Sequence, residues 1–203
     1  MAVTTLTPRY LLFYIAVFVV TIWVFNNIPS GWIEALTAQT ATWALNIVGH
    51  AASWQQVDRY TTLTLLGQHF VTVSIIRECT ALNVLGVMTG LILPLKASLV
   101  KRATGITLSS FLLFTLNIPR IALTVYLTAY DTWPFTLIAN RGLETYHYPI
   151  SFAFGVIGVA ITVLVVSRWA TPELADTLLE FVDMILGSGR KSGANTQASR
   201  DST

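Results

Sequence analysis

The sequence predicts an all-α integral membrane protein with about four transmembrane helices, an interfacial helix and a short extracytoplasmic hairpin. Three observations support this fold class. Of the 203 residues, 54% are hydrophobic and 11% are charged, whereas soluble domains carry about 25% charged residues. Several stretches are apolar over the roughly 20 residues that a helix needs to cross a bilayer. Basic residues gather on one side of these stretches, as they do in membrane proteins.

The transmembrane segments are expected at residues 8–25, 75–95, 105–130 and 148–169. The first is at the short end of the range for a span and resembles a signal peptide in its apolar character. However, it lacks a clearly basic start, and no convincing small-residue cleavage site follows it directly. We therefore expect it to remain as a membrane anchor.

Two shorter elements are predicted between the first and second spans. Residues 32–48 carry apolar side chains, tryptophan among them, at helical spacing, which favours a helix at the membrane interface. Leu63 and Leu65, then Val71 and Val73, alternate with polar residues on either side of a glycine. This period-two pattern predicts a short hairpin that leads into the second span.

The chain after the last span divides into a helix and a tail. Thr171 and Pro172 form a favourable helix start, and residues 172–186 then place an apolar stripe opposite acidic residues. Residues 188–203 are small and polar and are expected to be disordered. Residues 1–187 are therefore predicted to form a single membrane domain.

Basic residues set the expected orientation, because cytoplasmic loops carry an excess of Lys and Arg. With four spans, three basic regions fall on the same side: Arg9, residues 96–102, and the chain from Arg168 onward. This side is expected to be cytoplasmic. Residues 26–74 and 131–147 then face outward.

Three polar or reactive side chains lie near the outer ends of the predicted spans. Arg120 is inside the third span, where an arginine costs on the order of 3 kcal/mol. It stays charged, so it needs a polar or anionic partner. Cys79, the only cysteine in the chain, and His147 begin the second and fourth spans. We expect the thiol, the imidazole and the guanidinium to meet near the outer membrane surface.

Helical spacing places further polar residues beside these three. They are Asn83, Asn117 and Ser151, each about one turn from one of the three, together with Glu78, which flanks the thiol. We expect these four side chains to support the reactive groups. Glycines on the same helix faces are expected to serve mainly close packing.

A thiol, an imidazole and a guanidinium form a consistent set for acyl transfer. The thiolate is the reactive form of cysteine and is favoured at a helix N-terminus and near a cation. Histidine can take the thiol proton and return one to a leaving amine, and arginine can stabilise an oxyanion. Attack on a peptide carbonyl would give a thioester that a second nucleophile resolves. The sequence has no zinc-type cluster and no phosphate-binding loop, so we expect no cofactor.

At these residues the sequence resembles the exosortase/archaeosortase family of membrane-embedded cysteine transpeptidases. The resemblance rests on Arg-Glu-Cys-Thr-Ala-Leu at residues 77–82, on Leu-Asn-Ile-Pro-Arg-Ile at residues 116–121, and on His147 opening a span with Gly155 after it. These segments occur in the family's order and span roughly residues 67–169. In the family a small residue and then glycine usually follow the cysteine, whereas Thr80 and Ala81 stand here.

The resemblance implies a cysteine peptidase or transpeptidase with Cys79 as nucleophile, Arg120 as stabilising cation and His147 as acid and base. Family members recognise a C-terminal sorting signal on secreted proteins, made of a short motif, a transmembrane stretch and a basic tail. They cleave near the motif, and some pass the new C-terminus to a lipid. The implied partners are membrane-tethered proteins and the lipid bilayer. The implied location is the plasma membrane of a prokaryote, with the site on the extracytoplasmic face.

The residues alone leave two other functions open. In a small transporter, Arg120 would be an anion site and His147 part of a proton relay, although the cytoplasmic halves of the spans are apolar. In a non-enzymatic assembly partner, Arg120 would bridge to another subunit, and Cys79 would be an inert apolar residue. The net charge of +2 is too small to indicate nucleic-acid binding.

Overall fold

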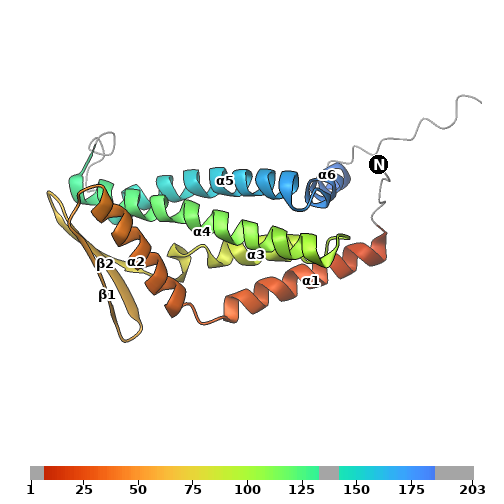
Figure 1. Ribbon diagram of the computed structural model, residues 1–203, viewed down its shortest axis with the longest axis horizontal. Helices are drawn as coiled ribbons and strands as arrows, with labels where there is room; N and C mark the ends of the chain where they lie inside the picture. Colours follow the sequence, from red (N-terminus) through yellow and green to blue (C-terminus); the bar gives the residue numbers. More distant parts are fainter. Residues whose placement is uncertain (1–6, 133–141, 186–203) are drawn as a thin grey trace, which may run out of the picture.

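The computed structural model describes residues 7–132 and 142–185. Long helices run side by side, and a small antiparallel sheet lies at one end of them (Figure 1). In chain order the elements are α1 (Pro8–Asn27), α2 (Gly31–Ile47), β1 (Ala52–Val57), β2 (Tyr60–Leu66), β3 (Phe70–Ile75), the 3-10 turn η1 (Arg77–Cys79), α3 (Leu82–Ile92), α4 (Leu99–Tyr130), α5 (Leu143–Trp169) and α6 (Glu173–Ile185). This architecture confirms the predicted helical membrane fold with its hairpin.

Three helices among the described residues are long and apolar enough to cross a membrane, namely α1, α4 and α5. The segment 75–95, which the sequence predicts as the second span, contains the shorter apolar helix α3. This helix has 11 residues and is therefore about 16 Å long. It begins only at Leu82 because Ile75 still belongs to β3 and the 3-10 turn follows. Among the described residues, three helices are thus long enough to be full spans, and the shorter helix α3 packs against α1 and α4.

Helices α1 and α3 approach each other closely at two glycines. A Cβ atom added to Gly86 would lie 2.8 Å from Cβ of Phe25, and one added to Gly90 would lie 2.9 Å from Cδ2 of Phe18. Real Cβ atoms do not come this close, so both positions need glycine for the helices to pack. The packing role expected for glycines on the Cys79 side of this segment therefore holds at these two positions.

Strands β2 and β3 form the predicted hairpin, with Leu63 opposite Val73 and Leu65 opposite Val71. Leu63, Leu65 and Val73 are buried, because alternate side chains of a strand point to the same face. Strand β1 adds a third strand in the order β1-β2-β3. Strand β1 could not be predicted from the sequence, since its mostly exposed residues show no apolar alternation.

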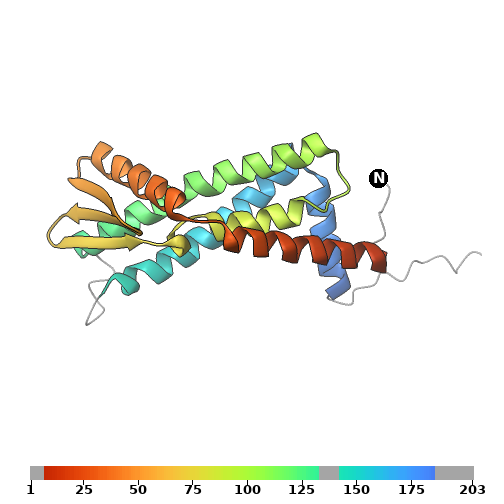
Figure 2. The same ribbon diagram turned by 90° about the horizontal axis from the view of Figure 1, so that it is seen from below.

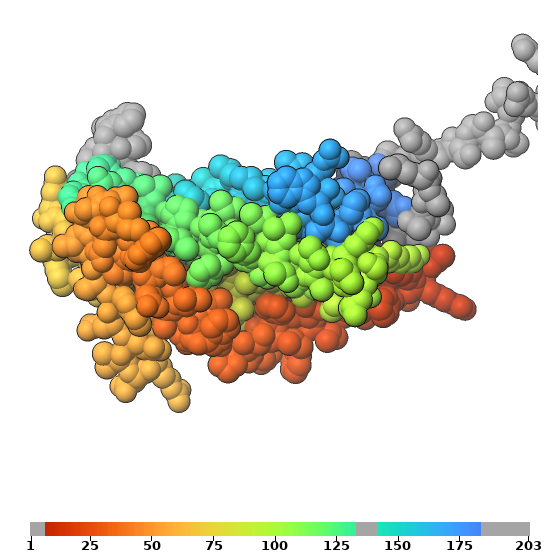
Figure 3. Space-filling view, viewed as in Figure 1, coloured from red at the N-terminus to blue at the C-terminus, as the bar shows by residue number. Residues whose placement is uncertain are grey.

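The buried face of the sheet packs against α2 and the C-terminal half of α4. The hydrophobic core at this contact includes Ala38, Ala41, Leu45, Ile121, Val125 and Ala129. The sheet and α2 lie at the same end of the bundle in both ribbon views, and the β1–β2 hairpin projects beyond the helices (Figure 3). The 3-10 turn that carries Cys79 therefore lies where the sheet meets the bundle.

Helix α6 lies at the opposite end of the bundle from the sheet (Figure 2). It begins at Glu173, one residue after the start of the predicted range 172–186, and is described as far as Ile185. Phe181 packs edge-on against Tyr14 of α1, with ring centroids 5.3 Å apart. Lys101 Nζ lies 2.7 Å from Glu173 Oε1. These contacts dock α6 against the ends of α1 and α4. The tail 188–203, predicted to be disordered, lies outside the described residues.

Candidate active site

Cys79 is the last residue of the 3-10 turn between β3 and α3, and its side chain is half-buried. Its backbone N–H donates to Ile76 O at 2.8 Å, and Thr80 N–H donates to Arg77 O at 3.0 Å. The Thr80 hydroxyl then accepts from Leu82 N–H at 3.3 Å, which starts α3. The thiol thus lies three residues before α3, outside the helices that are long enough to span the membrane.

Two side chains one turn apart on α4 reach the backbone of this turn. Asn117 Nδ2 donates to the carbonyl of Cys79 at 2.9 Å. Arg120 Nη2 contacts the carbonyls of Glu78 and Cys79, each at 3.4 Å. Asn117 is buried, so its bond to Cys79 is shielded from solvent and holds the main chain of Cys79 in place.

His147 lies in the second turn of α5, and its Nδ1 is 3.4 Å from the hydroxyl of Ser151. Together with Cys79 and Arg120 it lines one small cavity under β3, with Val73 and Thr124 among the other lining residues. The cavity has a volume of about 20 Å³, which is room for about one water molecule. The structure therefore brings the three sequence-predicted residues together, from η1, α4 and α5.

Burial governs the protonation of the thiol. It raises the pKa of Cys79 above its ordinary value, against the effects of a hydrogen bond with the Ile76 backbone and of the Arg120 charge, which lower it. The carboxylates of Glu78 and Glu34 act in the same direction as burial. A helix terminus and a cation are expected from the sequence to favour the thiolate, but burial outweighs the Arg120 charge, and α3 begins only three residues after Cys79. At pH 7 the group is a neutral thiol that needs a base.

The four supporting residues predicted from the sequence have different surroundings. Asn117 and Ser151 contact Cys79 and His147 as described. Glu78 contributes its main-chain carbonyl to Arg120, while its side chain is exposed. Asn83 is exposed and accepts a hydrogen bond from Arg77 Nε at 3.2 Å, so it supports the turn from outside and does not line the cavity.

Sequence reasoning missed two residues that act on the turn. Arg77 donates to the carbonyl of Ile28 at 2.9 Å and to that of Phe25, which ties the turn to the end of α1. Glu34 of α2 is buried, accepts a hydrogen bond from Ser30 Oγ at 2.6 Å and acts electrostatically on Cys79. The signal for Glu34 was available, because it is the one charged residue in the 17-residue helix α2.

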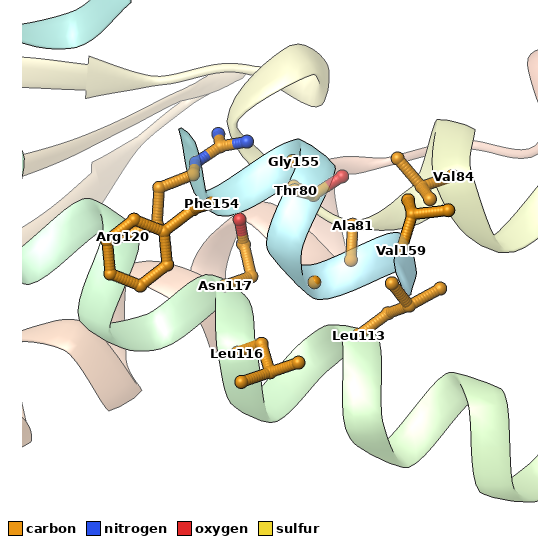
Figure 4. Close-up of a pocket in the computed structure, with 11 residues that line it drawn as sticks. Thr80, Ala81, Val84, Leu113, Leu116, Asn117, Arg120, Phe154, Gly155 and Val159 are labelled. Atoms are coloured by element: carbon orange, nitrogen blue, oxygen red, sulfur yellow. The ribbon is translucent and has the colours of Figure 1, made fainter. Parts of the chain in front are cut away.

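Arg120 also lines a second cavity, of about 50 Å³, between α3, α4 and α5. Figure 4 shows Arg120 and Phe154 at one end of this cavity and Leu113 and Val159 at the other. Three residues with polar side chains line this cavity, namely Thr80, Asn117 and Arg120. Thr80 directly follows Cys79 in the chain, and the other two donate to the Cys79 carbonyl. Arg120 therefore stands between an apolar cavity and the cavity that holds the thiol.

In residues 7–132 and 142–185, His, Cys, Asp and Glu side chains form no group of three that could hold a metal ion. The arrangement instead defines a multi-pass helical membrane protein with a thiol, an imidazole and a guanidinium around one cavity. The sequence model of the transmembrane exosortase family matches residues 2–136, which is more than half of the 203 residues. The chain therefore belongs to the transmembrane exosortase family, as its resemblance predicted.

The matched range includes Cys79 and Arg120 and ends before His147. Comparisons with curated proteins and with solved structures give no match. The inclusion of His147 in the candidate site therefore rests on its position in the cavity beside the other two residues.

Proposed function

We propose that this protein is a membrane cysteine peptidase or transpeptidase that cleaves C-terminal sorting signals of membrane-tethered secreted proteins. Membership of the exosortase family supports a sorting role. The observation that carries the chemistry is the shared cavity of Cys79, Arg120 and His147. These residues come from three separate elements, and each supplies one function that thiol-based acyl transfer requires.

In the first half of the reaction, the sulfur of Cys79 attacks the scissile carbonyl while His147 takes the thiol proton. A base is needed because burial keeps the thiol protonated. The guanidinium of Arg120 donates to the oxyanion of the tetrahedral intermediate. The C–N bond then breaks, His147 returns the proton to the leaving amine, and a thioester remains on Cys79.

In the second half, an acceptor nucleophile attacks the thioester. His147 takes the proton of the acceptor, the C–S bond breaks, and Cys79 leaves as a thiolate that His147 reprotonates. With water as acceptor the outcome is hydrolysis. With a lipid or another envelope component as acceptor the outcome is transpeptidation.

The proposed site faces the extracytoplasmic side. Lys96, Lys101 and Arg168 lie in or beside the helix ends near α6, at the other end of the bundle from the sheet. Basic residues mark the cytoplasmic side of membrane proteins. The turn with Cys79 lies beside the sheet, so a secreted substrate held in the membrane by its own transmembrane stretch would present its motif there.

The test is a cleavage assay in cells that co-express the protein with secreted proteins of the same genome that end in a short motif, a transmembrane stretch and a basic tail. Wild type should shorten the substrate, whereas Cys79→Ser, Arg120→Ala and His147→Ala should insert normally and fail to do so. His69→Ala, an exposed histidine in the β2–β3 turn, is the matched control and should retain activity.

A covalent intermediate gives a second readout. Because Cys79 is the only cysteine, a substrate adduct that hydroxylamine releases identifies this residue directly. If Cys79→Ser processes substrate as well as wild type, the thiol is not the nucleophile. Substrate processing at the same rate in cells that lack the protein would instead favour the assembly-partner interpretation.

A further inference from the structure

The second cavity contains space that the protein itself leaves unfilled. A Cβ atom added to Gly155 would meet nothing within 4 Å, in contrast to Gly86 and Gly90, where added atoms would clash with α1. Gly155 lines the cavity, so its lack of a side chain leaves room there and serves no close helix contact. The expectation that glycines on this face of α5 serve mainly packing fails at this position.

The chemistry of the walls defines what can fill this space. Leu113, Leu116 and Val159 are apolar, while Arg120 and Asn117 supply polar atoms. Apolar cavities exclude water and take up apolar groups. The Arg120 donor at one end of the cavity favours an occupant that carries a hydrogen-bond acceptor close to its apolar group. An apolar residue of a peptide has both, since its own carbonyl or that of its neighbour can face Arg120.

The direction of the cavity indicates which part of the peptide enters it. From Arg120 to Leu113 it follows α4 for seven residues, about 10 Å along the helix, away from the sheet and towards the middle of the bundle. The thiol cavity lies on the sheet side of Arg120. A substrate whose scissile carbonyl sits beside Cys79 and whose following residues enter the membrane would pass Arg120 and continue into the second cavity.

We propose that this cavity is the subsite for the first apolar side chain after the scissile bond, and that Gly155 sets the size of the side chain accepted. The inference rests on the proposed function, because it assumes that a peptide is cleaved at Cys79. It adds a residue that determines specificity and assigns the start of the substrate's transmembrane stretch to the face between α3, α4 and α5.

Disulfide crosslinking tests the subsite without requiring catalysis. The Cys79→Ser variant has no native thiol, so Gly155→Cys in that background carries a single cysteine. It would be expressed with substrates that carry one cysteine scanned across the junction of the motif and the transmembrane stretch. We expect a disulfide at one or two adjacent substrate positions. Ala160→Cys, at an exposed position on the same helix, is the matched control and should give none.

Equal crosslinking of Gly155→Cys and Ala160→Cys, or none from either, would overturn the subsite and leave lipid as the occupant of the cavity. This outcome is distinct from failure of the proposed function, which appears as substrate processing by Cys79→Ser. Crosslinking at Gly155→Cys shows that the peptide enters the cavity, and cleavage by the wild-type protein then relates the crosslinked residue to the scissile bond.

Substrate selectivity supplies the second test. Gly155→Leu should fold, because its side chain enters open space, and should slow cleavage of a substrate with a large residue at the crosslinked position by at least about tenfold. Replacing that substrate residue with alanine should restore the rate, and Ala160→Leu should leave both rates unchanged. A Gly155→Leu protein with the selectivity of wild type would refute the assignment.

Discussion

Arg77 ties the turn that carries Cys79 to the C-terminal end of α1, and its replacement by alanine should loosen both. The guanidinium donates to the carbonyl of Ile28 at 2.9 Å and to that of Phe25, while Nε donates to Asn83 Oδ1 at 3.2 Å. The last carbonyls of a helix lack intrahelical partners and favour a nearby cation. Arg77→Ala removes all of these bonds at once.

The magnitude follows from the two part-buried bonds. Hydrogen bonds to charged groups each contribute about 1.5–3 kcal/mol, so the lower end gives a loss of about 3 kcal/mol, with little added by the exposed bond to Asn83. For a chain of this length, each kcal/mol lowers the melting temperature by about 2–4 °C. We therefore expect Arg77→Ala to melt roughly 6–12 °C below wild type, and Arg77→Lys to fall between the two because a single ammonium cannot reproduce the fork.

Two probes measure this effect in detergent. Tryptophan fluorescence reports unfolding of the whole chain, and alkylation of Cys79, the single thiol, reports opening of the turn. Below the melting temperature, Arg77→Ala should be alkylated faster than wild type. Arg168→Ala, an exposed arginine at the end of α5, is the control. If Arg77→Ala and Arg168→Ala melt at the same temperature and react at the same rate, Arg77 does not anchor the turn.

Asn117→Leu should insert normally but lower kcat in the cleavage assay by about a hundredfold, as expected for a misplaced nucleophile, because the carbonyl of Cys79 loses its 2.9 Å bond. Iodoacetamide should alkylate Cys79 slowly at pH 7, because the thiolate is the reactive form and burial raises the pKa of the thiol. The alkylation rate should then rise about tenfold per pH unit up to that pKa. A rate that has already reached its plateau at pH 7 would contradict this. Burial is the largest single effect on the pKa of Glu173 and raises it, but the hydrogen bond from Lys101, a backbone hydrogen bond and the Lys101 charge together lower the pKa by more. The pair therefore stabilises the fold above the ordinary glutamate pKa and ceases to do so as the pH falls through the lowered value. Glu173→Gln should cost at most about 1 kcal/mol at pH 7 and nothing in acid, measured by thermal melts at both pH values.

The fold could be predicted where one physical signal dominates. Apolar length identifies α1, α4 and α5, and period-two alternation identifies the β2–β3 hairpin, because each reflects a single buried surface. The extent of α3 could not be read in the same way. Apolar residues continue on both sides of this helix, at residues 75–76 and 93–95, and only the pairing of β3 with β2 shows that the helix begins as late as Leu82.

The site could be predicted as a set of residue types but not as a set of contacts. Cys79, Arg120 and His147 stand out because reactive or charged groups are costly at membrane depth. Arg77 does not stand out in the sequence, because arginine is common at the membrane surface. Its importance for the turn follows only from its hydrogen bonds to the carbonyls of Phe25 and Ile28 at the end of α1. The protonation of Cys79 also depends on three-dimensional burial, which no spacing rule supplies.

The contacts of Arg120 suggest how the cost of an intramembrane arginine is offset. Among the described residues its hydrogen bonds are two contacts of 3.4 Å to main-chain carbonyls, longer than the usual 2.7–3.2 Å, although a guanidinium has five donors. In the proposed reaction, the rest of its donor capacity would be used when negative charge develops on a substrate oxygen beside Cys79. Interactions made mainly in the transition state raise kcat and leave ground-state binding little changed.

Arg120→Lys separates this role from simple attraction of substrate, because lysine keeps the charge but loses the planar fork. If the guanidinium stabilises the oxyanion, steady-state cleavage should show kcat reduced by about 10²–10³, as for loss of an oxyanion-hole donor, with KM little changed. A raised KM with unchanged kcat would instead mean that Arg120 acts on bound substrate and transition state alike. In that case its position between the two cavities would serve substrate binding, and the oxyanion would need another donor near Cys79.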